Sequence, residues 1–479
     1  MKKDGYITVY LALTMAILLS LIVTLIEGIR IQTIRFQTEC VMDIGLNSIF
    51  AEYNRQALKQ YGLLLLDTSY GYENPSDEKV KSKLLQYMNM NFDAPGKGNI
   101  AGYKDLTAIH ADNANFSQVS YASDCKGSVL TYQIIQYMKE KNGMALLDQY
   151  CPDLDLVKDG EGIYEELENR RHENNGIIES IINMLNAQLQ EGEDEISIDN
   201  PADYVDGMRS HSILDYVVSD VNQISRKEID LSKYISHRKT EEGSGLWEEQ
   251  ESPDGFIDKR LYHRYLFEKC GYYQREKENS LLSYQLEYLL YGKNRDDKNL
   301  QKFAEGIFKI RYAINAAYLF SNPEKMMQAE ELAAVVTSAI MHPELTEAVK
   351  ISILFAWIYA ESIQDVKIIF DGKKAARGKD DTSWNVPLSE LLTFTAHLNE
   401  YHDVPDGTGY DDYLSAFLFI KNKEDVRMHF MDIMEMDIKK TTGNENFALD
   451  HCVYQLEAGV NVSSRYGYGC RITRRYSYE

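Results

Sequence analysis

Proline, tryptophan and basic residues are scarce in this chain of 479 residues. It contains 9 Pro and 3 Trp, and 51 Lys and Arg against 74 Asp and Glu, which gives a formal net charge of −23. A nucleic-acid-binding surface needs a basic stripe that displaces counterions from phosphates, so DNA and RNA are not expected partners. The acidity is typical of a solubilising surface.

The common catalytic and cofactor motifs are also missing. The sequence has no P-loop, no G-x-S-x-G and no G-x-G-x-x-G, and its six Cys show neither C-x-x-C nor a metal-type spacing. In a chain of this length most of these Cys are expected to be buried thiols rather than a disulfide framework. We therefore predict no catalytic, cofactor or metal site, and no enzyme activity.

One histidine pair resembles a zinc helix without meeting its rules. His397, Glu400 and His402 have the spacing H-x-x-E-x-H, which fits neither H-E-x-x-H nor H-x-x-E-H. His402 also lies close to Pro405, where a helix must end. These residues are not predicted to bind metal.

Two acidic stretches resemble calcium loops. In the first, Val157 and Lys158 stand where a calcium loop offers oxygen and Gly, which favours a solvated acidic loop. Its acidic residues are Asp153, Asp155 and Asp159, and those of the similar second stretch are Asp406, Asp411 and Asp412.

Residues 348–370 form the most apolar segment after the N-terminus. Lys350, Glu361, Asp365 and Lys367 would each be costly in lipid, so this segment is expected to be a core helix rather than a second membrane span. Glu361 and Asp365 lie one turn apart, and we expect them to form a buried structural ion pair with Lys or Arg of a neighbouring helix.

The N-terminal stretch from Tyr6 to Ile26 contains no charge, no Pro and no Gly. At about 1.5 Å per residue it spans the roughly 30 Å of a bilayer interior, so we predict a membrane anchor that runs from Tyr6 through Leu19 to Ile26. A cleaved secretory signal would have a shorter apolar core and a small-residue cleavage site, which the following Glu27-Gly28-Ile29-Arg30 does not supply. The lipid bilayer is the expected partner.

Basic residues flank this stretch on both sides, Lys2 and Lys3 before it and Arg30 and Arg35 after it. The balance leans towards a cytoplasmic N-terminus, with the bulk of the chain extracytoplasmic and held by a single pass.

The helical pattern continues beyond the apolar stretch. No Pro occurs before Pro75, and apolar residues recur at helical intervals from Glu27 to about Tyr61. This predicts one unbroken helix of about 55 residues, about 80 Å long. Such a helix is the shape of a pilin, and it is equally compatible with a membrane anchor that continues as a stalk.

The expected fold is α+β and mostly α, a long N-terminal transmembrane helix that continues into an external domain with a small antiparallel sheet and a large inserted helical block. Strands near residues 105 and 455 are expected to share the sheet, because both regions are compatible with β structure and the second alternates in polarity. A turn near Tyr466 would place Cys452 and Cys470 out of register.

The predicted parts are 1–65, transmembrane and spine helix; 66–150, an α+β segment with a helix ending near Asn142; 151–200, an acidic, solvated helical hairpin; 201–255, a connecting segment with a linker at 238–255; 256–445, a helical block; and 446–479, strands that return to the sheet.

The opening "GYITVYLALTMAILL" resembles tight-adherence pilus pseudopilins of the TadE/TadG type. The resemblance implies cleavage by a prepilin peptidase between Gly5 and Tyr6. It also implies a Glu at the fifth position of the mature helix, where this sequence has Tyr10. This difference favours a pseudopilin, or minor component, over a major pilin.

Further stretches, including "NSIFAEYNRQALKQYGLLLLD" and "ILFAWIYAESIQDVKIIFDGK", are similar to an uncharacterised family of large single-anchor proteins from Gram-positive anaerobes, whose members often accompany tight-adherence pilus genes. The resemblance implies a membrane-anchored, extracytoplasmic pseudopilin-like component that is structural rather than catalytic, with pilus assembly proteins as partners. Two alternatives stay open: a cell-surface binding protein or adhesin that uses the Tyr-rich distal domain, and, with only generic carboxylates and histidines behind it, an extracytoplasmic hydrolase.

Overall fold

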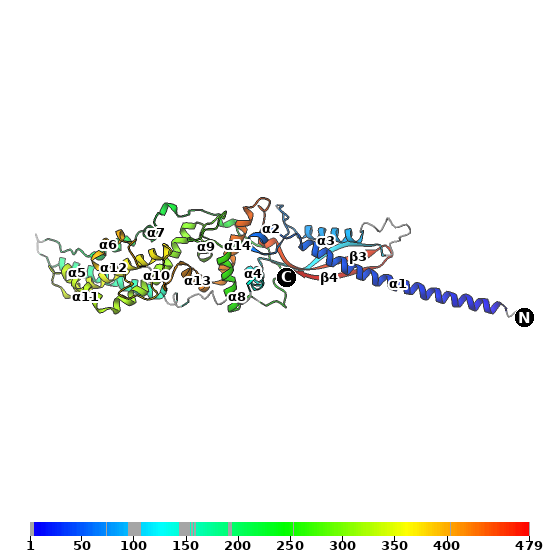
Figure 1. Ribbon diagram of the computed structural model, residues 1–479, viewed down its shortest axis with the longest axis horizontal. Coiled ribbons are helices and arrows are strands. Elements are labelled where there is room, and N and C mark those ends of the chain that lie inside the picture. Colours follow the sequence, from blue (N-terminus) through cyan, green and yellow to red (C-terminus); the bar gives the residue numbers. More distant parts are fainter. Residues whose placement is uncertain are drawn as a thin grey trace. The chain divides into compact units, whose positions relative to one another are not determined.

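The computed structural model describes residues 4–72, 74–93, 107–142, 154, 157, 160–189, 194–251, 253–402 and 404–478. The chain divides into two compact units, each assembled from separate stretches of sequence. The sheet unit comprises residues 1–141, 232–255 and 431–479, and the helical unit comprises residues 142–231 and 256–430. The fold is α+β and mostly α, with one small antiparallel sheet and a large inserted helical block, as predicted (Figure 1).

The sheet unit begins with the long helix α1 and ends with the hairpin β3–β4. Its elements in chain order are α1 (Asp4–Phe50), α2 (Arg55–Tyr61), β1 (Leu66–Asp67), α3 (Asp77–Phe92), β2 (Ile109–Tyr121), α4 (Asp124–Asn142), η4 (Leu231–Lys233), η7 (Leu449–His451), β3 (Cys452–Ser464) and β4 (Gly469–Ser477).

Strand β3 is the centre of the sheet. It pairs antiparallel with β2 from Ile109↔Ser464 to Tyr121↔Val453, and with β4 and the short β1. The prediction that the strands near residues 105 and 455 share one sheet is therefore confirmed, and the two strands are direct neighbours in it. The register places Cys470 opposite Val462, so Cys470 and Cys452 do not face each other, as predicted.

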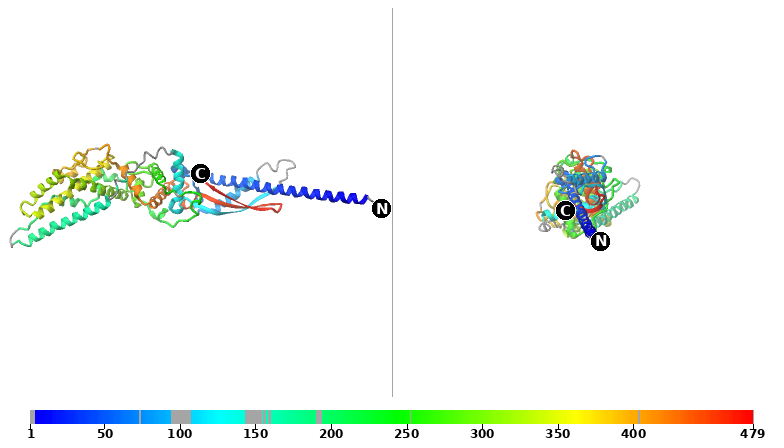
Figure 2. Two further views of the ribbon diagram at one scale, coloured as in Figure 1. Left: turned by 90° about the horizontal axis from the view of Figure 1, so that it is seen from below. Right: turned by 90° about the vertical axis from the view of Figure 1, so that its right-hand side faces the viewer.

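Helices α1 and α3 pack over one face of this sheet. Alternate β3 residues from Leu456 to Val462 face the helices because successive side chains of a strand point to opposite faces. The same core contains α1 and α3 side chains, and α1 contacts α3 closely at Gly45, where an added Cβ would lie 3.0 Å from Leu84. Figure 1 and the left view of Figure 2 show α1 running along the strands and its N-terminal part continuing beyond them.

The predicted unbroken helix of about 55 residues is wrong, because α1 ends at Phe50 and a separate helix, α2, begins at Arg55. The side chain of Asn54 accepts hydrogen bonds from the backbone of Gln56 and Ala57, which stabilises a new helix start. The backbone N–H of Asn54 itself donates to Leu65 O. The chain therefore turns between Phe50 and Arg55, although the apolar residues of the sequence keep their helical spacing across this turn.

The segment 238–255, predicted as a linker, has no helix or strand among its described residues, which leave out residue 252, but it belongs to the sheet unit, and we call it the strap. The Asp124 carboxylate accepts hydrogen bonds from the backbone N–H groups of Gly243 and Gly245 at 2.8 and 2.9 Å. Arg238 forms ion pairs with the buried carboxylates of Glu435 and Asp450 at 2.7 and 2.6 Å. These bonds fix the strap to the sheet unit, although its charged and Gly-containing composition is typical of a flexible linker.

The helical unit is built from helices and short 3₁₀ turns. They are α5 (Gly160–Asn186), α6 (Pro201–Met208), α7 (Leu214–Val217), η3 (Val221–Gln223), α8 (Phe256–Lys269), α9 (Gln285–Tyr291), α10 (Asp296–Ser321), α11 (Pro323–Val336), α12 (Pro343–Phe370), η5 (Leu388–Glu390), η6 (Phe394–Ala396), α13 (Tyr410–Ile420) and α14 (Lys423–Lys439), the last of which crosses the boundary between the two units.

The acidic stretch predicted as a solvated hairpin is instead one long helix, α5, with a buried face. Asn174 donates to the backbone of Ala348 in α12, and the Tyr164 ring packs against Tyr312 of α10. Even a charged side chain, Arg171, lies on this buried face, where it pairs with Asp206 of α6 at 2.9 Å. The acidic composition alone therefore predicted more exposure to solvent than α5 has.

Helix α12 is the core of the helical unit, as predicted for residues 348–370. After it, the described residues of the range 371–409, all but residue 403, contain two 3₁₀ turns and a bridge as their only regular structure, where the sequence predicted mainly helix. Pro387, Gly407 and Gly409 explain the difference, because Pro and Gly disfavour helix interiors.

Candidate functional site

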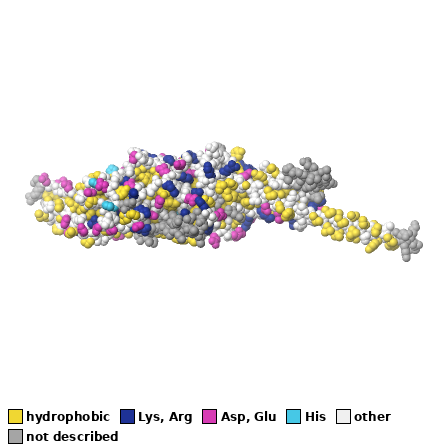
Figure 3. All heavy atoms as spheres, in the orientation of Figure 1, with side chains coloured by type: hydrophobic (Ala, Val, Ile, Leu, Met, Phe, Trp, Pro, Cys, Tyr) yellow, Lys and Arg dark blue, Asp and Glu magenta, His cyan; other side chains and the backbone are white. Residues whose placement is uncertain are grey.

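The first half of α1 is exposed on all sides within the sheet unit. The exposed fractions of the predicted anchor residues Tyr6, Leu19 and Ile26 are 85%, 57% and 52%. Figure 3 shows hydrophobic side chains covering this part of the helix. By length and composition the helix from Tyr6 onwards can cross a membrane, a property that a signal sequence near the N-terminus shares. Gly5 lies in the first turn of α1, directly before Tyr6.

The second half of α1 has two different faces. One face is buried on the sheet and carries Ile34, Val41, Met42, Leu46 and Ile49. The opposite face, which we call the outer strip, carries Ile29, Phe36, Cys40 and Ile44, all of them exposed. Their separations of seven, four and four residues place them on one side of a helix. The outer strip therefore continues the apolar surface of the first half along a single line.

A ladder of polar and aromatic contacts holds α1 against the β3–β4 hairpin. The Arg30 guanidinium lies over the Tyr466 ring, 4.3 Å from its centroid, and Arg35 Nε donates to the Tyr468 hydroxyl at 2.7 Å. Further along, Arg474 forms ion pairs with Glu39 and Asp43, each at 3.3 Å. No local pattern in the sequence indicates these contacts, because their partners lie more than four hundred residues apart.

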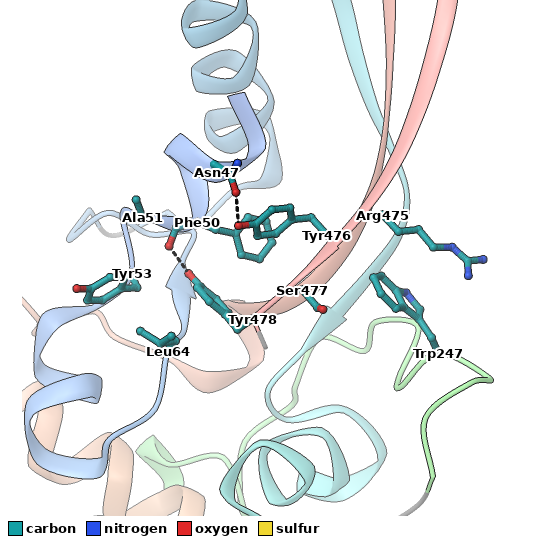
Figure 4. Close-up of a pocket in the computed structure, with 10 residues that line it drawn as sticks. All are labelled: Asn47, Phe50, Ala51, Tyr53, Leu64, Trp247, Arg475, Tyr476, Ser477 and Tyr478. Atoms are coloured by element: carbon teal, nitrogen blue, oxygen red, sulfur yellow. Dashed lines mark hydrogen bonds between the residues drawn. The ribbon is translucent and has the colours of Figure 1, made fainter. Parts of the chain in front are cut away.

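An aromatic cleft of about 590 Å³ opens where α1 ends (Figure 4). The Tyr476 hydroxyl donates to Asn47 Oδ1 at 2.5 Å, and the Tyr478 hydroxyl donates to the Phe50 carbonyl at 2.8 Å. The other lining residues are Ala51, Tyr53, Leu64, Trp247, Arg475 and Ser477.

Arg475 and Trp247 form the polar side of this cleft. The Arg475 guanidinium lies 5.4 Å from the Trp247 ring and pairs with Glu457 and Glu249 at 2.9 and 3.1 Å. The buried Trp247 Nε1 has no hydrogen-bond acceptor among the described residues. Rings beside a guanidinium suit stacking and hydrogen bonding with a polar ligand rather than covalent catalysis. Trp247 belongs to the strap. Because this segment was expected to be a linker, the sequence did not indicate that Trp247 lines a cleft.

The zinc-like residues do not converge. His397 Nδ1 lies 3.3 Å from Glu400 Oε1, whereas His402 is placed by its backbone N–H, which donates to Asn385. Over the part of the chain that the structure describes, no group of three or more His, Cys, Asp or Glu side chains could hold a metal ion.

The calcium-like stretches have different outcomes. The first one's Asp153, Asp155 and Asp159 lie outside the described residues. In the second, Asp411 accepts from the Tyr272 hydroxyl and Asp412 accepts from the backbone of Gly409, which caps α13. Asp406 lies in the turn before that helix. The carboxylates of Asp411 and Asp412 thus serve local structure.

Glu361 and Asp365 form the buried ion cluster that the sequence predicts. Lys379 Nζ lies 2.5 Å from Glu361 Oε1 and 2.8 Å from Asp365 Oδ1, and Arg311 of α10 pairs with Asp365 Oδ2 at 2.8 Å. The four side chains are almost completely buried. Burial raises the pKa of Asp365, but Arg311 and Lys379 outweigh it and hold that pKa below its usual range.

The backbone completes this cluster. Glu361 Oε2 accepts from the N–H of Val386 at 2.8 Å, and the Val386 carbonyl accepts from the indole N–H groups of Trp357 and Trp384. Both carboxylates are fully engaged with cations and N–H groups, which fits a structural role.

Comparison with known proteins gives one match. A protein-family model described as a family of unknown function, DUF5702, matches residues 191–464, more than half of the chain. The matched range includes the helices from α6 to α14, the strap and strand β3, and leaves out α1 to α5, β1, β2 and β4. No curated protein and no solved structure matches the chain. The chain belongs to the DUF5702 family of unknown function.

Proposed function

We propose that the protein is a membrane-anchored, extracytoplasmic pseudopilin-like component of a tight-adherence pilus system, structural rather than catalytic. The observation that carries the proposal is the division of α1 into a wholly exposed apolar half and a half packed on an antiparallel sheet. This arrangement resembles that of a pilin subunit, in which one helix serves both as membrane anchor and as spine of the external domain.

The outer strip favours this proposal over a plain anchor. An anchor requires only the stretch from Tyr6 to Ile26, yet apolar side chains continue along one face as far as Ile44. The exposed fraction of Phe36 is 70%, and burying a side chain of this kind stabilises an assembly by roughly 1.5–3 kcal/mol. A neighbouring helix laid along the strip would recover that free energy, and we assign this place to α1 of a second copy.

Tyr10 bears on the role within an assembly. A Glu at this position would neutralise the amino terminus of a neighbouring subunit in lipid, where an unpaired charge is costly. Tyr10 offers no charge, so the protein is proposed as a minor component rather than the main subunit of a fibre.

Cys40 provides a direct test because it is a free, exposed thiol within the outer strip. Membranes containing the full chain are treated with a short bis-maleimide, and dimers are identified by mass spectrometry of the linked peptides. We expect a Cys40–Cys40 link that is lost in Phe36→Glu, with Cys40→Ala as the control for links through the exposed Cys125. If Cys40 reacts fully with a monofunctional maleimide but never links two chains, the pairing of two α1 helices is contradicted. The protein would then be a plain membrane anchor.

The aromatic cleft favours a second candidate, a cell-surface binding protein. Its Trp247, Tyr53 and Arg475 side chains offer stacking surfaces and a guanidinium to a saccharide or peptide. Binding of isolated wall polysaccharide, measured by Trp fluorescence, is expected to be lost in Trp247→Ala and kept in Trp384→Phe, which changes an indole of the helical unit.

A further inference from the structure

The turn between β3 and β4, residues 465–468, lies beside α1 just after the apolar stretch ends, and we call it the hairpin tip. Tyr466 stacks beneath Arg30, and Tyr468 accepts from Arg35. The backbone N–H of Arg465 donates to Ala108 O, which ties the tip to the start of β2. The tip is therefore held at a fixed height along α1.

This height can be compared with the layers of a bilayer. Arg30 follows Ile26 by four residues, which is about 6 Å along the helix axis. The headgroup region extends about 5–7 Å beyond the hydrocarbon on each side. If the stretch from Tyr6 to Ile26 fills the hydrocarbon, Arg30 and the Tyr466 ring stacked on it lie at headgroup level. Arg35 and Tyr468 lie about 7 Å further out.

The side chains at this height suit a phospholipid surface. Arg30, Arg35 and Arg465 gather at this height in a chain whose net charge is −23, and Arg30 also forms an ion pair with Glu27 at 2.7 Å. The Arg465 side chain is exposed, and the exposed fraction of Tyr466 is 46%. Arginine binds phosphate through a planar fork of N–H donors, and Tyr is enriched at membrane interfaces because its ring is apolar and its hydroxyl is polar.

We infer that the hairpin tip docks on phospholipid headgroups, with Arg30 and Arg465 at lipid phosphates and the Tyr466 ring at the boundary with the acyl chains. This inference rests on the proposed membrane anchoring of α1. The tip adds a second contact beside the helix. A single helix is free to rotate about its axis in the bilayer, whereas a helix with a docked hairpin presents one fixed face, and the outer strip then points in a constant direction along the membrane.

Depth-dependent quenching tests the docking on the full chain. Tyr466→Trp keeps an aromatic ring beneath Arg30 and adds a reporter, and the chain is reconstituted into phosphatidylcholine–phosphatidylglycerol vesicles with lipids brominated high in the acyl chain. After subtraction of the parent signal, at least a twofold quenching of the new indole is expected. The matched control is Tyr72→Trp, an exposed position that follows β1 at the opposite end of β3, and it should show no quenching.

A second variant separates docking from anchoring. Arg465→Gln in the Tyr466→Trp background is expected to reduce the quenching while vesicle flotation stays unchanged. An unquenched Tyr466→Trp reporter in a protein that still floats with vesicles would overturn the docking and leave the anchor intact. Loss of flotation in the parent chain would overturn the anchor itself, and with it the proposed function.

Discussion

Arg311 Nε on α10 donates to Asp365 Oδ2 on α12 across 2.9 Å, and both side chains are fully buried. Removing one partner of such a pair leaves an uncompensated buried charge, which costs about 3–5 kcal/mol. We therefore predict that Asp365→Asn lowers the free energy of unfolding of the helical unit by about that amount. Urea unfolding followed by Trp fluorescence is the measurement, since Trp357 and Trp384 both donate to Val386 beside the cluster.

The matched control for this prediction is Glu344→Gln, an exposed carboxylate in the first turn of the same helix. Its interaction with the helix dipole is worth less than about 1 kcal/mol. Equal losses in the two variants would show that the buried pair contributes nothing specific.

Glu287 predicts a pH dependence in the helical unit. Burial raises the pKa of its carboxyl to about 7, and the Tyr410 hydroxyl and the Tyr273 N–H only partly oppose this. Below about pH 4.5 the group is protonated in both states, whereas between about 4.5 and 7 the folded state binds more protons than the unfolded one. The free energy of unfolding therefore falls as pH rises through this window.

Glu287→Gln should remove that loss, because Gln imitates the protonated acid. The variant is expected to be about 3 kcal/mol more stable than the parent at about pH 8 and nearly equal to it at about pH 4.5, in urea titrations at both values. A constant difference across this range would assign the effect to packing instead of ionisation.

Leu19 tests the anchor. An Arg at the centre of a membrane helix costs about 3 kcal/mol on the insertion scale, so Leu19→Arg should release the protein from membranes or stall its insertion. Leu19→Ala, which shortens the side chain without adding charge, should fractionate like the parent. Carbonate extraction followed by immunoblotting measures both variants, and membrane-bound Leu19→Arg would mean that another part of the chain holds the protein there.

Processing at Gly5 distinguishes a pseudopilin from an uncleaved anchor. Cleavage would give a mature chain that starts at Tyr6 and lacks Lys2, Lys3 and Asp4, whose charges resist extraction of the helix from the bilayer. The N-terminal peptide of the membrane-purified protein should begin at Tyr6 in cells with the prepilin peptidase and at Met1 in cells without it. A start at Met1 in both strains contradicts the pseudopilin proposal.

Orientation can be checked separately. With Lys2 and Lys3 held in the cytoplasm, protease added to cells stripped of wall should degrade the chain beyond residue 40 and spare the anchor. A cytoplasmic marker protein that stays intact provides the control. Protection of both units in these cells, followed by digestion after lysis, would reverse the proposed topology.

Local patterns were enough to predict some elements of the fold. Alternation in Cys452–Val462 predicted β3, and the β-compatible residues of the first region predicted a strand in the same sheet, which is β2. The buried carboxylates Glu361 and Asp365 were predicted to meet a cation of a neighbouring helix, and Arg311 of α10 is that cation. The second cation, Lys379, comes from the irregular segment after α12, where no periodicity indicates which side chains turn inward.

Other features depend on residues too far apart in sequence for a local pattern to connect them. The strap looked like a linker because it is charged and contains Gly, yet those glycines donate backbone N–H groups to Asp124, more than a hundred residues earlier. Arg30 and Tyr466 meet only because α1 lies along the last hairpin. The break after Phe50 depends on a single Asn cap inside a stretch whose apolar periodicity continues unchanged.

The pairing of β2 with β3 imposes an order on biosynthesis. Tyr121 pairs with Val453, so more than three hundred residues must be translated after β2 before its partner exists. At about 5–20 residues per second this takes on the order of 15 to 70 s. During that time α1 and α3 have been translated without the strand whose apolar residues complete their core. A chain that stops before Cys452 lacks the strand that joins β1, β2 and β4, so the sheet can be completed only near the end of translation.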